Sequence, residues 1–510
     1  MTSANIPVAG APGRFRRWTT PSWLRLLRLE IRHSAMAWLV PLAAVLFWYN
    51  AYRPALAVPP LWSLRALGMQ HAALLDFVLP VTGAAAWMGS RDSRRGTADL
   101  TGLAGRPQWI RQLTSWAAVT FWALVAYAGC VGVLYAVTAQ QASWGGPLWW
   151  PAVIGAVGLP VLASLGYAAG SWLPGRFTAP LVSIAAFFAL GFSAEWAHGG
   201  RSYWQISPII PGAVDVGANP GVATFYHYLP DLPIAQVMFL AGLTAVLIGL
   251  LGCPPGAGGR RIRAVAAVIA AAGLAAAVTA VALVGTAQLE PHGMMRIPAL
   301  HDAASDRPIT YTPTCGQGAV PVCLNPAFAA YLPVASAALA DVVKEVAGLP
   351  GVPERILQAA PTFVQQPNDG ISVGSSAGTA GHPANVLLAA LPDQLPGERQ
   401  PDVTAAQFAA QIRAQVGAAL VAVVVGSNGE GSAAQQAVRA GVLMAAGVRL
   451  APAGGRSGLP GMAAPGPARG TPVYRAALRF AALSAAARHA WLSAHLPALR
   501  AGRLTLAQLP

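Results

Sequence analysis

The sequence predicts an α-helical polytopic membrane protein of about seven transmembrane helices, followed by an α+β external domain. Three observations predict this class. Hydrophobic residues make up 55% of the 510-residue chain and charged residues only 10%, whereas soluble domains carry about 25% charged residues. Long runs with almost no charge fill residues 36–286 and then stop. Arginine residues concentrate in alternate loops between these runs.

The apolar runs have lengths typical of membrane-spanning helices. A bilayer core of about 30 Å requires roughly 20 apolar residues per helix. The first run follows a long polar and amphipathic segment, so we expect a retained span and not a cleaved signal peptide. The chain then divides into a cytoplasmic N-terminus (1–35), a transmembrane domain (36–286) and an external domain (287–510). The seven runs, of which the first two are short, are 36–52, 72–89, 113–138, 148–173, 177–197, 234–253 and 264–286.

The arginine residues also predict the orientation of the spans, because basic residues in short loops stay on the cytoplasmic side. With the N-terminus inside, fifteen arginines of residues 1–286 fall inside and three fall outside, namely Arg53, Arg65 and Arg201. An odd number of spans then sends everything after Thr286 outside. We therefore expect a multi-pass protein of the cytoplasmic membrane, with a cytoplasmic N-terminus and an extracellular C-terminal domain.

The formal net charge of +15 at pH 7 agrees with this orientation. Most of the basic excess lies in residues 1–286, where it would face the anionic headgroups of the lipid bilayer. No nucleic-acid partner is needed to explain the charge.

The external segment is predicted to fold as an α+β domain with more helix than strand, from the spacing of its apolar residues. Two stretches rich in Gly, Ser and Pro, 366–383 and 452–471, are predicted to be flexible loops. The predicted helices are 325–348, 404–420, 431–447 and 472–497, and the predicted strands are 353–364 and 384–391.

Cys315 and Cys323 enclose a short loop in the external segment, where disulfides persist. We expect them to form a disulfide that stabilises the domain by about 2–3 kcal/mol. Cys130 and Cys253 lie within or at the end of apolar runs, and we interpret them as small buried hydrophobic residues.

The sequence contains no recognisable catalytic site. A phosphate-binding loop ends in Lys followed by Ser or Thr, but the only lysine, Lys344, is followed by an acidic residue. The His-Glu-x-x-His zinc motif is absent, and His489 and His495 are spaced to point in different directions around a helix. Ser375 and Ser376 stand in a Gly-rich loop that matches a nucleophile elbow only loosely. We therefore predict no catalytic residue, no metal and no cofactor in this chain.

Asp76 and Glu195 are acidic residues within apolar runs, where carboxylates are costly and often functional. Asp76 lies about one turn into the second run, and Glu195 lies near the outer end of the fifth. Both are expected to be close enough to a membrane interface to be solvated. Both are candidates for lining a transport path.

Two basic segments in or next to the predicted membrane domain have features that bear on its class. Residues 21–34 predict an interfacial amphipathic helix, with arginines on one face and leucine or isoleucine on another. Residues 91–112 combine arginines, a short predicted helix over 97–104 and a turn at Pro107. Each segment alone is equally typical of any basic membrane anchor or cytoplasmic loop.

Taken together and in this order, the two segments resemble the permease subunit of the type-2 ATP-binding-cassette (ABC) transporter family, of the actinobacterial type with a C-terminal external domain. That family has an N-terminal elbow helix, a set of spans and an inner loop of the form Arg-Gly-Thr-x-Glu-Leu followed by Pro. Here Asp99 replaces the usual Glu, and a seventh span and a large external domain depart from the family pattern. The positions that the resemblance assigns to the coupling loop are Arg94, Arg95, Gly96, Thr97, Asp99, Leu100 and Pro107.

The resemblance implies a transport subunit, of an exporter type, that is not itself an enzyme. A cytoplasmic ABC ATPase subunit would hold ATP and Mg²⁺ and drive alternating access through residues 91–112. A second permease subunit, in a homodimer or a heterodimer, would complete the path. One alternative stays open, in which the spans only anchor an external domain with a sensory, immunity or enzyme-like role.

Overall fold

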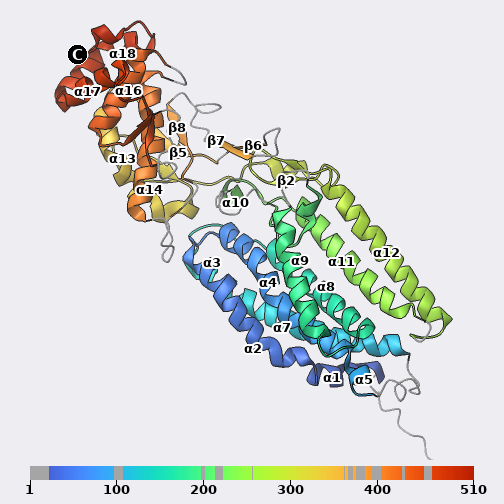
Figure 1. Cartoon of the computed structure of the whole chain (residues 1–510). Coiled ribbons are helices and arrows are strands. Elements are labelled where there is room, and N and C mark those ends of the chain that lie inside the picture. Colours follow the sequence, from blue (N-terminus) through green and yellow to red (C-terminus); the bar gives the residue numbers. More distant parts are fainter. Residues whose placement is uncertain are drawn as a thin grey trace, which may run out of the picture.

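Helices dominate the computed structural model, and they gather in two regions of an elongated molecule (Figure 1). We call residues 22–284, which form a set of long helices, the bundle, and residues 287–510 the C-terminal domain. The structure describes residues 22–96, 107–196, 202–212, 222–254, 257–360, 362–365, 371–374, 385–392, 395, 404–427, 431–452 and 462–510.

The bundle begins with the amphipathic helix α1 (Ser22–Arg32), as predicted, and continues with long apolar helices. The first long segment joins α2 (Ala35–Phe47), a π-helical turn (Trp48–Tyr52) and α3 (Arg53–Ala57) without a break. Each predicted apolar run overlaps one long segment. The others are α4 (Trp62–Gly89), α7 (Gln108–Gln141), α8 (Trp150–Trp172), α9 (Thr178–Glu195), α11 (Asp231–Gly252) and α12 (Arg260–Val284).

Helix α4 begins earlier than its apolar run, because Arg65 is accommodated inside the helix and not in a loop. The Arg65 side chain is buried and donates to the Thr138 hydroxyl of α7 at 3.3 Å. Arg65 therefore lies within a helix and not between helices, so the predicted start of the second span at residue 72 was wrong. A span predicted from hydropathy ends at an arginine, because the residue is charged. The folded helix can include the arginine where a hydrogen-bond acceptor compensates for burial of the guanidinium.

Small residues allow the long helices to approach each other closely. On α8, a Cβ at Gly170 would lie 2.1 Å from the carbonyl oxygen of Ala86, and one at Gly166 2.3 Å from that of Thr82, both on α4. Between α11 and α12, a Cβ at Gly242 would lie 2.6 Å from the carbonyl oxygen of Gly273. Apolar helices in lipid associate through such contacts, because no hydrophobic driving force operates between them.

Large hydrophobic side chains cover the outside of the bundle. Exposed examples include Trp38, Leu181, Phe188 and Val268, on three different long helices. Among the described residues of the C-terminal domain, Leu478 is the one exposed large hydrophobic residue. Soluble proteins rarely expose so much contiguous apolar surface, so the bundle is suited to lipid and the C-terminal domain to water.

Within the described residues, nine helices are long and apolar enough to cross a membrane by length and composition. Seven are the long segments of the bundle. The other two, Pro326–Val346 and Ala405–Val425, lie in the C-terminal domain and pack into its hydrophobic core. The structure is therefore mostly helical and compatible with a multi-pass membrane protein, with a small sheet region on the C-terminal side.

The C-terminal domain contains a four-stranded mixed sheet in the order β3-β4-β5-β8. Its strands are β3 (Thr314–Cys315), β4 (Val322–Leu324), β5 (Arg355–Gln358) and β8 (Val386–Ala389). The pair β3–β4 is antiparallel, and the pairs β4–β5 and β5–β8 are parallel. The described residues also form three two-stranded sheets: β1 (Gln288–Leu289) with β2 (Met295–Arg296), β6 (Thr362–Gln365) with β7 (Ile371–Gly374), and β9 (Leu450–Pro452) with β10 (Ala464–Gly466).

Helices pack against this sheet around a core that includes Phe408, Leu420 and Phe480, all fully buried. Capping boxes fix where two of the helices begin: Thr404 pairs with Gln407, and Ser432 pairs with Gln435. The helices are α13 (Leu332–Val346), α14 (Ala405–Ile412), α15 (Ala418–Val425), α16 (Ala433–Ala445), α17 (Pro472–Ala482) and α18 (Ala485–Arg500).

Two details of this domain differ from the prediction. The stretches 366–383 and 452–471 are not loops throughout, since β7 lies in the first and β10 in the second. The periodic segment 472–497 is two helices, α17 and α18, because Ser484 leaves the helical conformation and caps α18 through the amide of Ala487. Local composition predicts neither strand pairing nor a break between two helices of similar periodicity.

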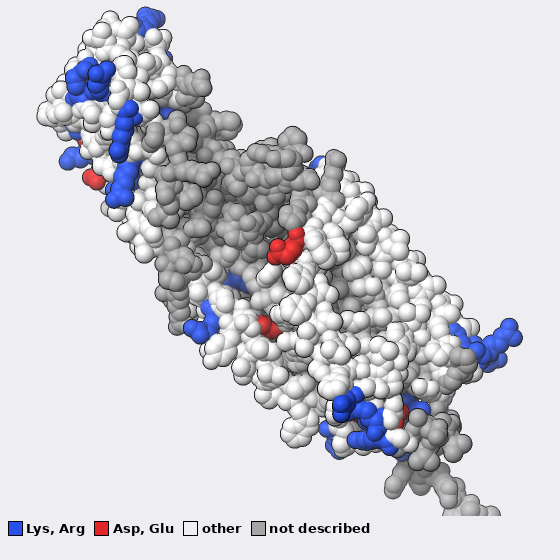
Figure 2. Space-filling view, viewed as in Figure 1, with Lys and Arg blue, Asp and Glu red and all other residues white. Residues whose placement is uncertain are grey.

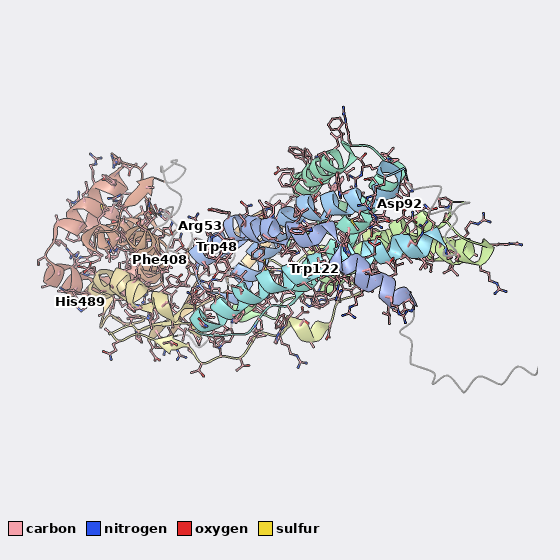
Figure 3. All side chains as sticks on the ribbon, turned by 90° about the horizontal axis from the view of Figure 1, so that it is seen from below. Trp48, Arg53, Asp92, Trp122, Phe408 and His489 are labelled. Atoms are coloured by element: carbon pink, nitrogen blue, oxygen red, sulfur yellow. A yellow bond between two sulfur atoms is a disulfide. The ribbon has the colours of Figure 1, made fainter. Side chains whose placement is uncertain are left out.

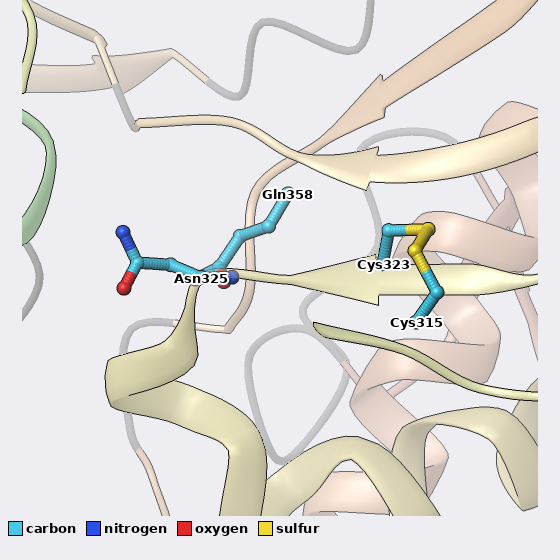
Figure 4. Close-up of a disulfide and its surroundings, with 4 residues drawn as sticks. All are labelled: Cys315, Cys323, Asn325 and Gln358. Carbon is cyan, nitrogen blue, oxygen red and sulfur yellow. A yellow bond between two sulfur atoms is a disulfide. The ribbon is translucent and has the colours of Figure 1, made fainter. Parts of the chain in front are cut away.

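Cys315 and Cys323 form a disulfide, as predicted (Figure 4). The two cysteines are direct partners across the antiparallel pair β3–β4. Beyond the end of β4, the backbone N–H of the buried Asn325 donates to the side-chain oxygen of Gln358 at 2.9 Å. Its own side-chain amide donates to the carbonyl oxygen of Thr224 at 3.1 Å. Asn325 thereby ties the C-terminal domain to a loop of the bundle.

Candidate functional site

Arginine residues gather at the end of the bundle that is remote from the C-terminal domain (Figure 2). We call this the basic end; it comprises α1, α5 (Arg91–Arg94) and the first turns of α7 and α12. Trp109, in the first turn of α7, connects this helix to α11 and to the segment before α12: its indole N–H donates to the carbonyl oxygen of Ile248 at 2.9 Å and its backbone N–H to that of Ala257 at 3.1 Å. The described arginines there are Arg25, Arg28, Arg32, Arg91, Arg94, Arg95, Arg111, Arg260, Arg261 and Arg263.

An ion pair joins α1 to α5 at the basic end. Arg91 donates to both carboxylate oxygens of Glu30, at 2.9 and 3.0 Å. The hydrogen bonds that Arg91 donates to Glu30 raise the pKa of Arg91 above its ordinary value, and this effect exceeds the lowering of the pKa by burial. Helix α1 is held from its other side by Trp122 of α7, labelled in Figure 3, whose indole N–H donates to the carbonyl oxygen of Ile31 at 2.8 Å.

Residues of the predicted coupling loop begin next to this ion pair. The Arg94 guanidinium stacks 3.3 Å above the ring of Trp87 and donates to its carbonyl oxygen at 2.6 Å. Burial lowers the pKa of Arg94, and the neighbouring charge of Arg95 lowers it further. A cavity of about 620 Å³, lined by Glu30, Trp87 and Arg94 among others, opens at this place.

The structure covers the predicted coupling loop only at its two ends. Arg94, Arg95 and Gly96 end α5, with Gly96 at φ 63°, a backbone conformation that favours glycine. Pro107 precedes the first residue of α7. Thr97, Asp99 and Leu100, with the predicted helix over 97–104, lie outside the described residues.

Asp76 lies in the middle of α4, and its side chain is almost completely buried. One carboxylate oxygen accepts a hydrogen bond from the Asn50 amide at 2.9 Å, and the other has no hydrogen-bond partner among the described residues. Asn50 belongs to the π-helical turn, a geometry frequent at functional sites. The expectation that Asp76 is solvated near an interface was wrong, because α4 extends further than its apolar run.

Glu195 is the last residue of α9 and is exposed, in agreement with the expected position. Neither Asp76 nor Glu195 lines the apolar pocket of about 370 Å³ that lies among α4, α8, α9 and α11. This pocket is lined by residues such as Leu74, Leu190 and Phe239. Its volume lies at the lower end of the range typical of small-molecule sites.

The residues considered for enzymatic chemistry do not assemble into a site in the described part of the chain. Lys344 lies on α13, inside a helix and not in a phosphate-binding loop. On α18, the His495 ring stacks on Trp491 and its Nδ1 lies 2.9 Å from the Trp491 carbonyl oxygen. His489 stands near the end of the molecule opposite Asp92 (Figure 3). Ser375 and Ser376 lie outside the described residues.

Around His301, the described residues form a polar group that the sequence did not predict. His301 lies between two acids, with Nδ1 3.2 Å from Asp231 and Nε2 3.1 Å from Asp306. Burial lowers the pKa of His301, but the hydrogen bond with Asp306 and the charges of both acids outweigh it and raise the pKa above its ordinary value. Asp306 is close to His301 in the sequence, but Asp231 precedes it by 70 residues and the three follow no motif, so no local signal indicated the group.

Comparison of the chain with protein-family models, with curated proteins and with solved structures found no match.

Proposed function

We propose that the chain is the membrane-spanning permease subunit of an ATP-driven ABC transporter, exporting its substrate with energy from a separate cytoplasmic ATPase subunit. The observation that carries the proposal is the ion pair between Glu30 and Arg91. It joins the amphipathic helix to the start of the 91–112 segment, the two features on which the family resemblance rests. Because the ion pair attaches the elbow helix to the coupling loop, a partner protein that moves the loop at the membrane surface would also move the helix.

Helix α4 connects the start of the 91–112 segment to the interior of the bundle. Only Ser90 separates α4 from α5, and α4 is the most buried of the long helices. It packs against α2, α8 and α9 and carries Asp76 at its centre. A displacement of residues 91–112 would therefore be transmitted to Asp76 and to the apolar pocket beside Leu74. In this proposal the pocket accepts the apolar part of a substrate, and a second permease subunit closes the path.

This arrangement requires seven spans and an external C-terminal domain. The two additional apolar helices, Pro326–Val346 and Ala405–Val425, bury their apolar faces in the core of the C-terminal domain. They are also free of the exposed large hydrophobic residues that cover the bundle. With seven spans, the basic end faces the cytoplasm and the disulfide lies outside, where it persists.

The orientation can be tested with single cysteines at opposite ends of the molecule. In a chain with Cys130→Ala and Cys253→Ala, we expect Ala501→Cys to react with a membrane-impermeant maleimide in intact cells. The exposed residue Ser93, in α5, provides the matched position. Ser93→Cys should be labelled only after the membrane is permeabilised, because the basic end faces the cytoplasm. Labelling in the reverse order would contradict the proposed orientation.

The coupling role can be tested by breaking the short helix predicted over 97–104. Leu100→Pro removes a backbone donor and clashes with the preceding turn, at a local cost of about 3 kcal/mol. It leaves the apolar spans and the flanking arginines unchanged. We expect a near-normal amount of protein in the membrane, but at least a tenfold loss of the ATPase that co-purifies with the tagged chain from its native membrane, and a loss of ATP-driven efflux.

Gln108→Ala, a mild change at the exposed first residue of α7, serves as the control and should preserve ATPase recovery and efflux. If Leu100→Pro and Gln108→Ala both retain ATPase and efflux at the wild-type level, residues 91–112 are only a basic connector. The anchored external domain would then become the better explanation of the fold.

A further inference from the structure

Acidic and histidine side chains from separate elements meet where α11 begins, on the side of the bundle facing the C-terminal domain. One ligand atom each from Glu290, His301 and Asp306 lie within 4.8 Å of one another. Glu290 follows β1, and Asp306 ends the short 3₁₀ helix Ala303–Asp306. Asp306 is exposed, and Glu290 and His301 are partly exposed, so solvent reaches the group.

A second, buried carboxylate points at this group from the bundle. Asp231, the first residue of α11, is fully buried. Its Oδ2 accepts the backbone N–H of Ile297 at 2.9 Å and lies 3.2 Å from Nδ1 of His301. Its Oδ1 has no hydrogen-bond partner among the described residues. Burying a carboxylate whose hydrogen bonds are incomplete costs free energy. Asp231 therefore requires a compensating interaction nearby.

The contact with Asp231 determines which ring nitrogen of His301 is available. A carboxylate at Nδ1 keeps a proton there, so Nε2 is the nitrogen that can bind a metal ion. Without a metal, Nε2 hydrogen-bonds with Asp306, 3.1 Å away, close to the carboxylate of Glu290. A cation that displaces the Nε2 proton would meet the imidazole lone pair and both carboxylates at one place. Carboxylate, histidine and metal in a row are the usual arrangement of protein metal sites.

We propose that Glu290, His301 and Asp306 bind a divalent transition-metal ion of the Zn²⁺ class, with Asp231 as the buried carboxylate that orients the histidine. One imidazole and two carboxylates are a ligand set suited to Zn²⁺, whereas Ca²⁺ and Mg²⁺ prefer oxygen alone. Water completes the coordination. Arg296, 3.2 Å from Glu290, balances part of the negative charge without entering the group.

The proposed metal would link the C-terminal domain to the bundle. Its ligands lie in residues 290–306, whereas the orienting carboxylate belongs to α11. Backbone contacts already hold this junction, such as that of the Met295 N–H with the Gly212 carbonyl at 3.1 Å. A bound ion would fasten the same junction at a second place and so make the position of the external domain depend on metal.

The test is titration of the purified full-length chain with ZnCl₂. The chain is solubilised in detergent, isolated through a streptavidin-binding tag to avoid added histidines, stripped with EDTA and studied by calorimetry at pH 7.5. We expect one saturable Zn²⁺ site per chain and a weaker response to CaCl₂ or MgCl₂. Co²⁺ in place of Zn²⁺ should give the visible absorption bands of a protein-bound ion.

Substitutions assign the ligands. His301→Ala should weaken Zn²⁺ binding at least 100-fold, and Asp306→Asn, at an exposed position, should weaken it without endangering the fold. Asp231→Asn should weaken it 10–100-fold and shift the Co²⁺ bands, since it acts through the orientation of His301. The control is His227→Ala, an exposed histidine outside the group, which should bind as wild type.

Three results would overturn the proposal: no saturable Zn²⁺ binding by the wild-type chain, equal affinity in the wild type and in a folded Asp306→Asn variant, or equal losses with His227→Ala and His301→Ala. Stronger binding of Ca²⁺ than of Zn²⁺ would overturn the transition-metal assignment. These outcomes do not depend on transport, so a failure here is distinguishable from a failure of the permease proposal.

Discussion

Replacing Gly170 by alanine is expected to destabilise the bundle by about 3 kcal/mol, because the added methyl group has no room between α4 and α8. Its Cβ would lie 2.1 Å from the carbonyl oxygen of Ala86 and 2.8 Å from the Ala86 Cα. These are backbone atoms, so no side chain can rotate away and the two helices must separate. Thermal unfolding in detergent, followed by tryptophan fluorescence, should show a clearly lower midpoint and less folded protein in the membrane.

Gly129→Ala provides the matched control. Gly129 lies on α7, is exposed, and an added Cβ there would meet nothing within 4 Å. The same substitution should leave the midpoint unchanged or raise it slightly, since alanine is the better helix former. Equal midpoints for Gly170→Ala and Gly129→Ala would show that α4 and α8 do not pack as closely as described.

Reversing either charge of the Glu30–Arg91 pair is expected to detach α1 from α5 and to lower recovery of the partner ATPase about tenfold. The pair is bidentate, and its side chains are only 12% and 28% exposed. Glu30→Arg or Arg91→Glu would place like charges at this partly buried contact. The double reversal restores opposite charges, so we expect most of the loss to be recovered, with a coupling free energy of about 2 kcal/mol.

The measurements are the thermal midpoint and the amount of ATPase that co-purifies with each variant. Arg28→Glu is the control for charge reversal on the same helix, because Arg28 is exposed and forms no ion pair with another described residue. It should change the midpoint little. If the double reversal is as impaired as the single ones, the ion pair is not what holds α1, and the observation that carries the permease proposal is lost.

The spans could be predicted because hydropathy is a property of a short stretch of chain. Every apolar run of residues 36–286 became a long helix. The prediction of span ends failed where one polar residue, such as Arg65, interrupts an apolar run. The second span was predicted to start too late, which placed Asp76 near the membrane interface, whereas Asp76 lies in the middle of α4. In the structure, both residues have a hydrogen-bond partner on another helical segment: Thr138 for Arg65 and Asn50 for Asp76.

The predicted functional residues depended on a resemblance more than on packing. The sequence indicated an amphipathic helix and a basic loop, but the ion pair between Glu30 and Arg91 required both to be folded. The group around His301 was missed altogether. Its members come from α11, from the hairpin β1–β2 and from residues 301–306, and a histidine beside an acid is informative only when the acid is a neighbour in space.

By itself the sequence determined the membrane class, the concentration of arginine at one end of the bundle and the disulfide, because hydropathy, charge and a short cysteine loop act over neighbouring residues. The tertiary structure alone decided which glycines touch a backbone, which carboxylates are buried and which side chains converge on His301. These features join residues distant in the chain, and the packing of helices, to which many weak contacts contribute, brings them together.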